Sequence, residues 1–433
     1  MRLPFFYGWV VVGVTFVTMA IGVNARTAFS LFYPPILTEF GWDRSVTAGA
    51  FSFGFVASAV GSPLIGRLMD RAGPRAVMEL GVVLMGGGLL LAPLTSEPWH
   101  LYLTIGVMVG AGSVCLGYSG QSLFLPNWFD RRRGLAIGIA FAGVGIGSVT
   151  LLPWVQHMIA QEGWRTACTA MGCAVVLVLA PINLLLRKRP EDIGLRPDGD
   201  DGPHATASAP ISNVIDPAWA GIDWTLRRAM RTARFWWLAA GYFSGLYVWY
   251  AVQVHQTKYL LEIGFSPTIA AWALGLVSLL GIPGQIALGH ASDRIGREAV
   301  WAISSAGFAI CFVALIALKA HPSMLLLYVM IAAQGALGYG LTSVMGAVVL
   351  EIFQGPHFGS IFGTIMLMGL IGGAAGPFVT GLIYDLTSSY TGGFAIGIAV
   401  SVLSAFSVWR AAPGKVRAVA GKLQRLHPAA DAA

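Results

Sequence analysis

Arg26 is the residue of this sequence that is best placed to bind a charged ligand. It is the one charged residue between positions 8 and 32, where its neighbours are apolar, small or uncharged. Burying a guanidinium in an apolar medium is costly unless the group is paired or faces water, so Arg26 is a functional candidate. A guanidinium at this place could bind the carboxylate of an organic anion. The alternative is an arginine near a kinked helix end that is paired structurally or extends toward water.

Uncharged polar residues could orient the same ligand. Helical steps of three and four residues share one face of a helix. The residues that share a face with Arg26 by such steps are Thr15, Met19, Gly22, Phe29, Ser30 and Tyr33. The candidates in other apolar stretches are Tyr118, Gln121, Tyr250, Gln253, Gln285 and Tyr339. Because buried polar groups need hydrogen-bond partners, part of this set could instead join helices to one another.

Enzyme chemistry is not expected. The four cysteines lie in apolar stretches without zinc-type spacing. The sequence contains no recognisable Ser, His and Asp set, metal cluster or phosphate-binding loop. We therefore expect no catalytic residue, no metal and no cofactor.

Composition indicates the class of protein. Of 433 residues, 56% are hydrophobic and 11% are charged, and the mean hydropathy is +0.71. A soluble protein of this length has about 25% charged residues. The net charge of +7 could suggest a nucleic acid partner, but the basic residues lie in short segments between apolar stretches. We expect a protein of the lipid bilayer, with no nucleic acid and no obligate protein partner.

Twelve stretches are long enough to cross a bilayer, which takes about 20 apolar residues. They cover residues 8–32, 46–66, 76–94, 99–125, 134–158, 166–186, 234–258, 268–289, 298–318, 323–350, 359–384 and 393–410. This predicts an all-α polytopic membrane protein with twelve transmembrane helices in two pseudo-symmetric six-helix halves. The expected units are residues 1–186, a linker 187–233, residues 234–410 and a tail 411–433. We expect the linker to hold an interfacial helix capped by Asp223, and the tail to have no special role.

The distribution of Lys and Arg predicts the orientation. With both termini cytoplasmic, 22 of the 27 basic residues lie on the cytoplasmic side, four lie outside and Arg26 lies within a span. Such an asymmetry follows the positive-inside rule. We expect a multi-pass protein of the plasma membrane, which in a bacterium is the cytoplasmic membrane.

Residues 41–77 return as residues 264–300, 223 positions later and without a gap. Each copy is an apolar span, a short charged turn and the start of another span. The turns share Gly66, Asp70 and Arg71 in the first copy and Gly289, Asp293 and Arg294 in the second. Glycine lets helix ends approach, and Asp can face a helix N-terminus or pair with Arg. The turns resemble the loops between helices 2 and 3 and helices 8 and 9 of the major facilitator superfamily, and we interpret them as gating or structural motifs.

A second motif points to a subfamily. Residues 128–143 resemble the signature of monocarboxylate-porter relatives, with an aromatic-Phe pair, a basic cluster, Leu-Ala and then spaced small residues. Residues 7–9, Tyr-Gly-Trp, match the end of that family's first motif. The resemblance implies a twelve-helix transporter that works by alternating access, and it places the family's helix-1 lysine at Arg26 or Thr27.

The sequence departs from that family at two positions. Gly281 and Gln285 stand where the family carries an Asp and an Arg. The residues that relatives use for proton coupling and for a second carboxylate contact are therefore missing. A coupling proton stays an open alternative, because His255 could titrate.

The sequence therefore predicts a secondary active transporter of small organic anions, with monocarboxylates first. Arg26 would bind the carboxylate, and a single fixed cation would favour monoanions over dianions. The alternative within transport is an exporter of hydrophobic or cationic compounds, which the aromatic-rich span 234–258 favours and the lack of a midspan acid opposes. A non-transporting membrane sensor is the third possibility, and it lacks an appended signalling domain.

Overall fold

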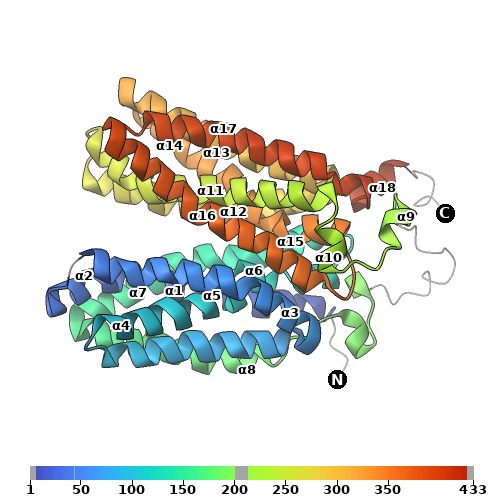
Figure 1. Ribbon diagram of the computed structural model, residues 1–433, viewed down its shortest axis with the longest axis horizontal. Coiled ribbons are helices and arrows are strands. Elements are labelled where there is room, and N and C mark those ends of the chain that lie inside the picture. Colours follow the sequence, from blue (N-terminus) through green and yellow to red (C-terminus); the bar gives the residue numbers. More distant parts are fainter. Residues whose placement is uncertain (1–5, 43, 200–212, 427–433) are drawn as a thin grey trace.

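The computed structural model describes residues 6–42, 44–199 and 213–426. Within these residues the chain is helical apart from turns, loops and one isolated bridge between Val214 and Arg417. Long helices run side by side along the longest axis of the molecule (Figure 1). The predicted all-α class is confirmed.

The N-terminal half occupies the lower part of Figure 1. Its elements are α1 (Gly8–Thr27), α2 (Phe29–Phe40), α3 (Arg44–Leu91), η1 (Ala92–Leu94), α4 (Pro98–Leu101), η2 (Tyr102–Val109), α5 (Gly110–Leu116), α6 (Tyr118–Gln121), η3 (Leu125–Trp128), α7 (Arg133–Ala174), η4 (Val175–Leu179) and α8 (Ala180–Asn183). Of these, η2 and η4 are π-helices.

The linker and the C-terminal half follow. The linker holds η5 (Pro190–Ile193), η6 (Pro197–Gly199), α9 (Pro217–Ala220) and α10 (Leu226–Ala229). The upper half of Figure 1 contains α11 (Ala233–Glu262), α12 (Pro267–Ile295), α13 (Arg297–Ala320), α14 (Met324–Ala332), the π-helix η8 (Ala333–Gly338), α15 (Gly340–Ile352), α16 (Phe358–Thr387) and α17 (Thr391–Ala411). Beyond them lie η9 (Pro413–Lys415) and α18 (Ala420–Leu426).

The described helices account for the twelve predicted spans. Nine stretches of the described residues are long and apolar enough to cross a membrane. Two of these stretches are pairs of spans, because glycines with positive φ break the helix at Gly73 (φ 76°) and Gly163 (φ 85°). The 30-residue α11 supplies the remaining span. The first of the nine stretches is Gly8–Tyr33, one residue longer than the expected span 8–32, and α2 continues as a helix to Phe40.

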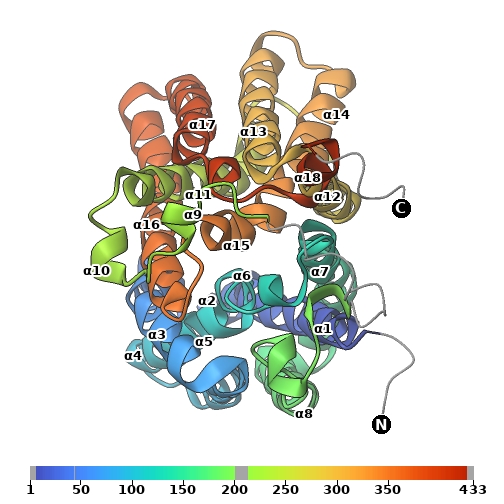
Figure 2. The ribbon, with the colours of Figure 1, turned by 90° about the vertical axis from the view of Figure 1, so that its right-hand side faces the viewer.

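The two halves meet most closely at one end. This end carries α9, α10 and α18, lies at the right of Figure 1 and faces the viewer in Figure 2, and we call it the linker end. Here α3 packs on α16 and α7 packs on α12. A Cβ atom at Gly66 would overlap the backbone of Gly359, and one at Gly134 would overlap Gly289. Glycine at these positions therefore lets the halves touch through their backbones.

The linker and the residues after α17 differ from the expectation. The helix expected after Asp223 is a single turn, α10, and its N-cap is Thr225, whose hydroxyl accepts from the amide of Arg228. The tail folds back across the linker end, where the amide of Ile215 donates to the carbonyl of Val416 at 2.9 Å. The tail thus has a structural role that the sequence did not indicate.

Candidate functional site

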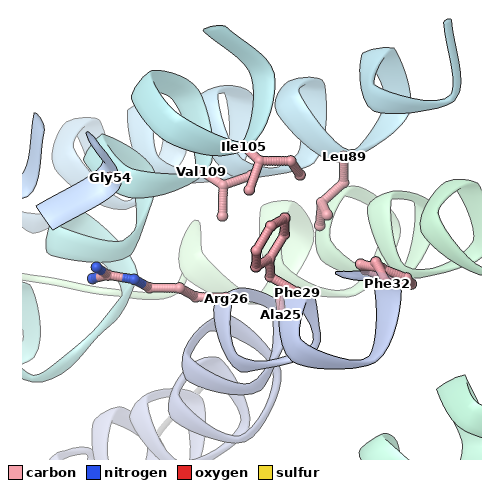
Figure 3. Close-up of a pocket in the computed structure, with 8 residues that line it drawn as sticks. All are labelled: Ala25, Arg26, Phe29, Phe32, Gly54, Leu89, Ile105 and Val109. Carbon is pink, nitrogen blue, oxygen red and sulfur yellow. The ribbon is translucent and has the colours of Figure 1, made fainter. Parts of the chain in front are cut away.

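Arg26 lies in the last turn of α1, and its guanidinium contacts two other helices. Its Nη1 donates to the hydroxyl of Ser113 at 3.0 Å and to that of Ser58 at 3.4 Å. The guanidinium carbon lies 4.2 Å from the ring centre of Phe55, within the range of a cation–π contact. Figure 3 shows the side chain extending away from the ring of Phe29. Arg26 is therefore held by α3 and α5.

The partners of Arg26 set its depth in the bundle. Ser58 lies halfway along the helical segment 44–73, which is one predicted span of α3. Ser113 lies halfway along the segment 98–128, which contains α4 to η3. The Arg26 guanidinium is therefore near the middle of the spans, although its own residue is near the end of α1.

A small cavity lies beside Arg26. Its volume is about 10 Å³, which is room for about one water molecule. The residues that line it are Ala25, Arg26, Phe29, Phe32, Gly54, Leu89, Ile105 and Val109 (Figure 3). Because its wall is largely apolar, this cavity does not by itself bind an anion.

Tyrosines of both halves lie in the region of Arg26, with Tyr118 from the N-terminal half and Tyr250 and Tyr339 from the C-terminal half. The ring of Tyr250 on α11 contacts that of Phe55 on α3, edge to face, at 5.6 Å between centres. The ring of Phe55 therefore contacts both Arg26 and Tyr250. The side chains of Tyr118 and Tyr339 lie near that of Tyr250. These groups come from both halves, so they surround one region at mid-depth.

Irregular backbone places two of these tyrosines. Gly117 has an extended conformation (φ −92°, ψ −163°), which ends α5 and starts α6 at Tyr118. The π-helix η8 ends at Gly338, directly before Tyr339. Interruptions of this kind in membrane helices are frequent at functional sites.

The repeated turns join the halves at the linker end. The carboxylate of Asp70 accepts from the amides of Gly359 and Ser360 at 2.8 and 2.9 Å, at the start of α16. In the second copy, the carboxylate of Asp293 accepts from the amides at the start of α7 at 2.9 and 3.1 Å. Each Asp therefore caps a helix of the opposite half, where the helix dipole favours a negative charge.

A buried charge cluster surrounds the second of these turns. Arg297 pairs with Asp293 at 2.7 Å and with Glu351 at 3.0 Å, and all three side chains are buried. From the tail, Arg417 donates to the carbonyl of Glu351 at 2.7 Å. The cluster thus joins the turn, α15 and the tail. Arg71 and Arg294 are both exposed. Within the repeated turns, the polar contacts with the opposite half are therefore made by the two aspartates.

The end opposite the linker is organised within the N-terminal half. Glu39 of α2 pairs with Arg165 and accepts from the indole of Trp164 at 2.6 Å. The hydrogen bond from Arg165 holds the pKa of Glu39 below its usual range. Ser62, Asp70 and Asp293 each make a hydrogen bond between the long helices of the two halves, and these bonds lie toward the linker end. The halves are therefore joined at the linker end.

Comparison with known proteins identifies the family. The model of the Major Facilitator Superfamily matches residues 14–263 and 255–430. The chain belongs to this superfamily. It is therefore a membrane transporter and not an enzyme, and the superfamily predicted from the repeated turns is confirmed.

Similar sequences and structures agree with that assignment. Monocarboxylate transporter 13 of Rattus norvegicus is 26% identical over 397 residues, which are 90% of this chain and 85% of that protein. The uncharacterized transporter YcxA of Bacillus subtilis is 26% identical over 392 residues, with 88% and 90% covered. The proton:xylose symporter XylE superposes with a TM-score of 0.71 at 15% identity, covering 96% of this chain and 99% of that one. The human organic anion transporter MFSD10 superposes with a TM-score of 0.66 at 18% identity, covering 94% and 100%. The structures show the shared fold, and the sequences support the predicted resemblance to monocarboxylate transporters.

Two of the three predicted glutamines, Gln121 and Gln253, bond to residues of their own half. Gln121 is 0% exposed and is used inside the N-terminal half, where it accepts from Thr15 at 3.2 Å and contacts Met78. Gln285 is 1% exposed. Gln253 is exposed and accepts from the indole of Trp249 at 2.8 Å. Arg26, Tyr118, Tyr250 and Tyr339 are therefore the predicted residues that the structure brings together.

Gly281 and Tyr339 explain one departure from the monocarboxylate porters. A Cβ atom at Gly281 would lie 2.6 Å from the ring of Tyr339. Tyr339 thus leaves no room for a side chain at position 281, where the resemblance places an acidic residue of the family. The ring of Trp249 packs against Tyr339 at 4.5 Å between centres.

Sequence reasoning missed three residues at the site, namely Phe55, Ser58 and Ser113. Both serines lie in the middle of predicted apolar spans, which is the signal that could have found them. Small hydroxyl residues are common in membrane helices, so this signal alone does not separate a site residue from a packing residue.

Proposed function

We propose that this transporter carries small organic monoanions, above all monocarboxylates, by alternating access. The observation that carries the proposal is Arg26, a guanidinium at mid-depth whose neighbour Phe55 contacts Tyr250 of the opposite half. Guanidinium groups match the geometry of carboxylates. The hydroxyl groups of Tyr118 and Tyr339 can each donate or accept a hydrogen bond to the rest of the ligand.

The distribution of acidic residues supports an anion rather than a cation. In the long described helices, the acidic side chains are those of Glu39, Asp70, Glu79, Glu162, Glu262, Asp293, Glu298, Glu351 and Asp385. All of these lie toward helix ends or breaks, away from the depth of Arg26. A cation at that depth would therefore meet the positive charge of Arg26, which opposes the alternative of a cation exporter. The names of the relatives, monocarboxylate transporters 12 and 13, support the same substrate class.

The fastening at the linker end supports alternating access. We take the linker end as cytoplasmic because most Lys and Arg residues flank it. The bonds of Asp70 and Asp293 then close the path from Arg26 to the cytoplasm, and the site would open to the other side of the membrane. Release into the cytoplasm would require both aspartates to leave their helix ends.

Uptake into proteoliposomes tests the proposal. We expect uptake of labelled straight-chain and hydroxy monocarboxylates of two to six carbons, measured with and without a pH gradient. Arg26→Ala should reduce this uptake about 10- to 100-fold, because hydrogen bonds to a charged group contribute about 1.5–3 kcal/mol.

A control variant separates the loss of this charge from a general effect. Lys258 is an exposed cation of α11, 3.8 Å from Glu262. Lys258→Ala should keep wild-type uptake, and both variants should reach the membrane in equal amounts. Undiminished uptake by folded Arg26→Ala, or failure of the wild type to take up any of these acids, would refute the proposed function.

A further inference from the structure

Two serine hydroxyls contact the guanidinium of Arg26 from neighbouring helices. Ser58 belongs to α3 and Ser113 to α5, and both accept from Nη1 of Arg26. We infer that Ser58 and Ser113 are positioning residues that hold Arg26 in the direction from which it binds the carboxylate. This inference rests on the proposed function.

The protons of both hydroxyls are directed away from Arg26. The hydroxyl of Ser113 donates to the carbonyl of Gly110 at 2.6 Å. That of Ser58 lies 2.8 Å from the same carbonyl and 2.7 Å from the carbonyl of Gly54. A hydroxyl has one proton and two acceptor lone pairs. Because the protons face these carbonyls, the lone pairs of both oxygens face the guanidinium.

Close packing of α3 on α5 brings the two serines together. A Cβ atom at Gly110 would lie 2.7 Å from the Cα atom of Gly54. Glycine at both positions thus lets the two backbones approach, so that one carbonyl can orient both hydroxyls. Gly110 follows the π-helix η2 directly. The π-helix therefore ends directly before the residue whose carbonyl orients the serines that contact Arg26.

The direction of Arg26 matters because its side chain has several rotatable bonds. Phe55 packs on the guanidinium and the serines accept from one of its nitrogens, so three side chains of α3 and α5 restrict it. A restricted guanidinium loses less conformational freedom when it binds a carboxylate. Loss of the hydroxyls should therefore weaken binding of the anion more than it changes the turnover of the loaded transporter.

Kinetics of uptake test the inference. With L-lactate and with the best-transported acid of the panel, Ser113→Ala should raise KM about 10-fold and leave the maximal rate within about twofold, from loss of one charge-assisted hydrogen bond. The double change of Ser58 and Ser113 to Ala should raise KM further. Ser113→Thr keeps the hydroxyl and should restore KM toward the wild-type value.

Ser148 supplies the matched control. This serine of α7 bonds to Asn24 at 2.9 Å and to the carbonyl of Val144 at 3.0 Å, in the same half. Ser148→Ala should leave KM unchanged at a similar cost in thermal stability. If Ser113→Ala and Ser148→Ala have the same KM, or if the loss is entirely in the amount of folded protein, the positioning role is wrong.

Chemical modification gives a readout that does not depend on the substrate. Phenylglyoxal labelling of Arg26, quantified by peptide mass spectrometry against the exposed Arg67, should be several-fold faster in the double alanine variant than in the wild type and in Ser148→Ala. Equal labelling rates would overturn the inference even if none of the acids is transported. Faster labelling with no uptake of any acid by the wild type would instead refute the proposed function alone.

Discussion

Gln285 is the residue at which we expect a second positive charge to change the preference between monocarboxylates and dicarboxylates. It is 1% exposed, and its side-chain oxygen has no hydrogen-bond partner within the described part of the chain. Its backbone is fixed, because its carbonyl accepts from the hydroxyl of Ser343 at 2.9 Å. When the turn at Gly289 is matched to the family motif, the resemblance to monocarboxylate porters places an arginine of that family at this position.

Gln285→Arg should shift the preference of the transporter toward dicarboxylates. The wild type offers one fixed cation, so succinate or oxalate should compete poorly with lactate for uptake near neutral pH. A second guanidinium would balance the second carboxylate, and it would leave a bound monoanion with an uncompensated positive charge. Competition assays measure the ratio of inhibition by succinate and by lactate.

Gln256 provides the control for a new buried charge. It is 1% exposed on α11, among the buried residues Tyr259 and Leu260 of the C-terminal half. Gln256→Arg should lower stability without raising the relative affinity for dicarboxylates. A wild type that already prefers dianions would contradict the charge count itself.

What the sequence could predict at the residue scale depended on charge. A single arginine in an apolar run is a rare pattern, and it led to Arg26. Gln121 and Gln285 were predicted by polarity and spacing, and both are buried in the structure, which leaves their role as ligand contacts a prediction. Helical spacing cannot separate a face that lines a cavity from a face that packs on another helix, because both are buried from lipid.

At the scale of elements, the two repeated turns use the same contact in unequal surroundings. The carboxylate of Asp70 accepts hydrogen bonds from two amides and from the hydroxyl of Ser360 at the start of α16. Asp293 accepts two amides at the start of α7 and also pairs with the buried Arg297. Loss of charge at Asp293 would therefore leave Arg297 with one carboxylate fewer, whereas loss of charge at Asp70 mainly weakens a helix cap.

Asp70→Asn should open the linker end more often without unfolding the protein. Weakening a charged cap by about 1–2 kcal/mol changes an equilibrium roughly 5- to 30-fold. In a background without the four native cysteines, Ser62→Cys reports the linker end, because Ser62 is buried and bonds to the carbonyl of Gly363. Labelling of this cysteine should rise in Asp70→Asn, and labelling of a cysteine at Gln253 should fall.

The matched control for this prediction is Asp385→Asn. Asp385 lies near the other end of α16 and is exposed. Its variant should show the wild-type labelling pattern. An unchanged pattern in Asp70→Asn would mean that the cap does not set the balance between the two open states. Asp293→Asn should in addition lower the melting temperature, since it removes one partner of a buried ion pair.

The spans were predictable because the bilayer fixes their length and apolarity, and α13 and α16 lie within three residues of the expected bounds. The π-helices η2 and η8 and the break at Gly117 were not predictable. A π-helix and an α-helix of the same composition have the same hydrophobicity, and a Gly in a membrane span serves close packing more often than a break. Tertiary contacts, such as Gly110 against Gly54, decide between these outcomes.

For the whole molecule, the tail is the part whose role the sequence hid. Arg417 is 7% exposed and donates to the carbonyl of Glu351, while its neighbours pair with residues 213–216 of the linker. Lys422 pairs with Glu298 at 2.9 Å. A short basic segment after the last span looks like a solvated extension, because nothing in its composition marks a buried arginine.

Arg417→Ala should lower the stability of the C-terminal half by about 1–3 kcal/mol, since a buried carbonyl loses a charged donor. Thermal melting of the purified transporter, and amide hydrogen exchange of residues 413–423, measure the effect. Arg410→Ala removes an exposed cation that lies 5.8 Å from the ring of Trp237, and it should change neither readout. Equal melting temperatures for the two variants would argue against a fastening role of Arg417.

The bridge between Val214 and Arg417 also has a topological consequence. Its two partners flank α11 to α17, so the segments that precede and follow the C-terminal half are paired with each other. This bridge lies beside the end of α15 that contains Glu351, since Arg417 donates to the carbonyl of Glu351. A cut or an inserted domain between Gly199 and Asn213 would leave both partners of the bridge in one fragment. The closure of that half would therefore survive separation from the other half, and this part of the linker is where the chain could be divided with the least loss.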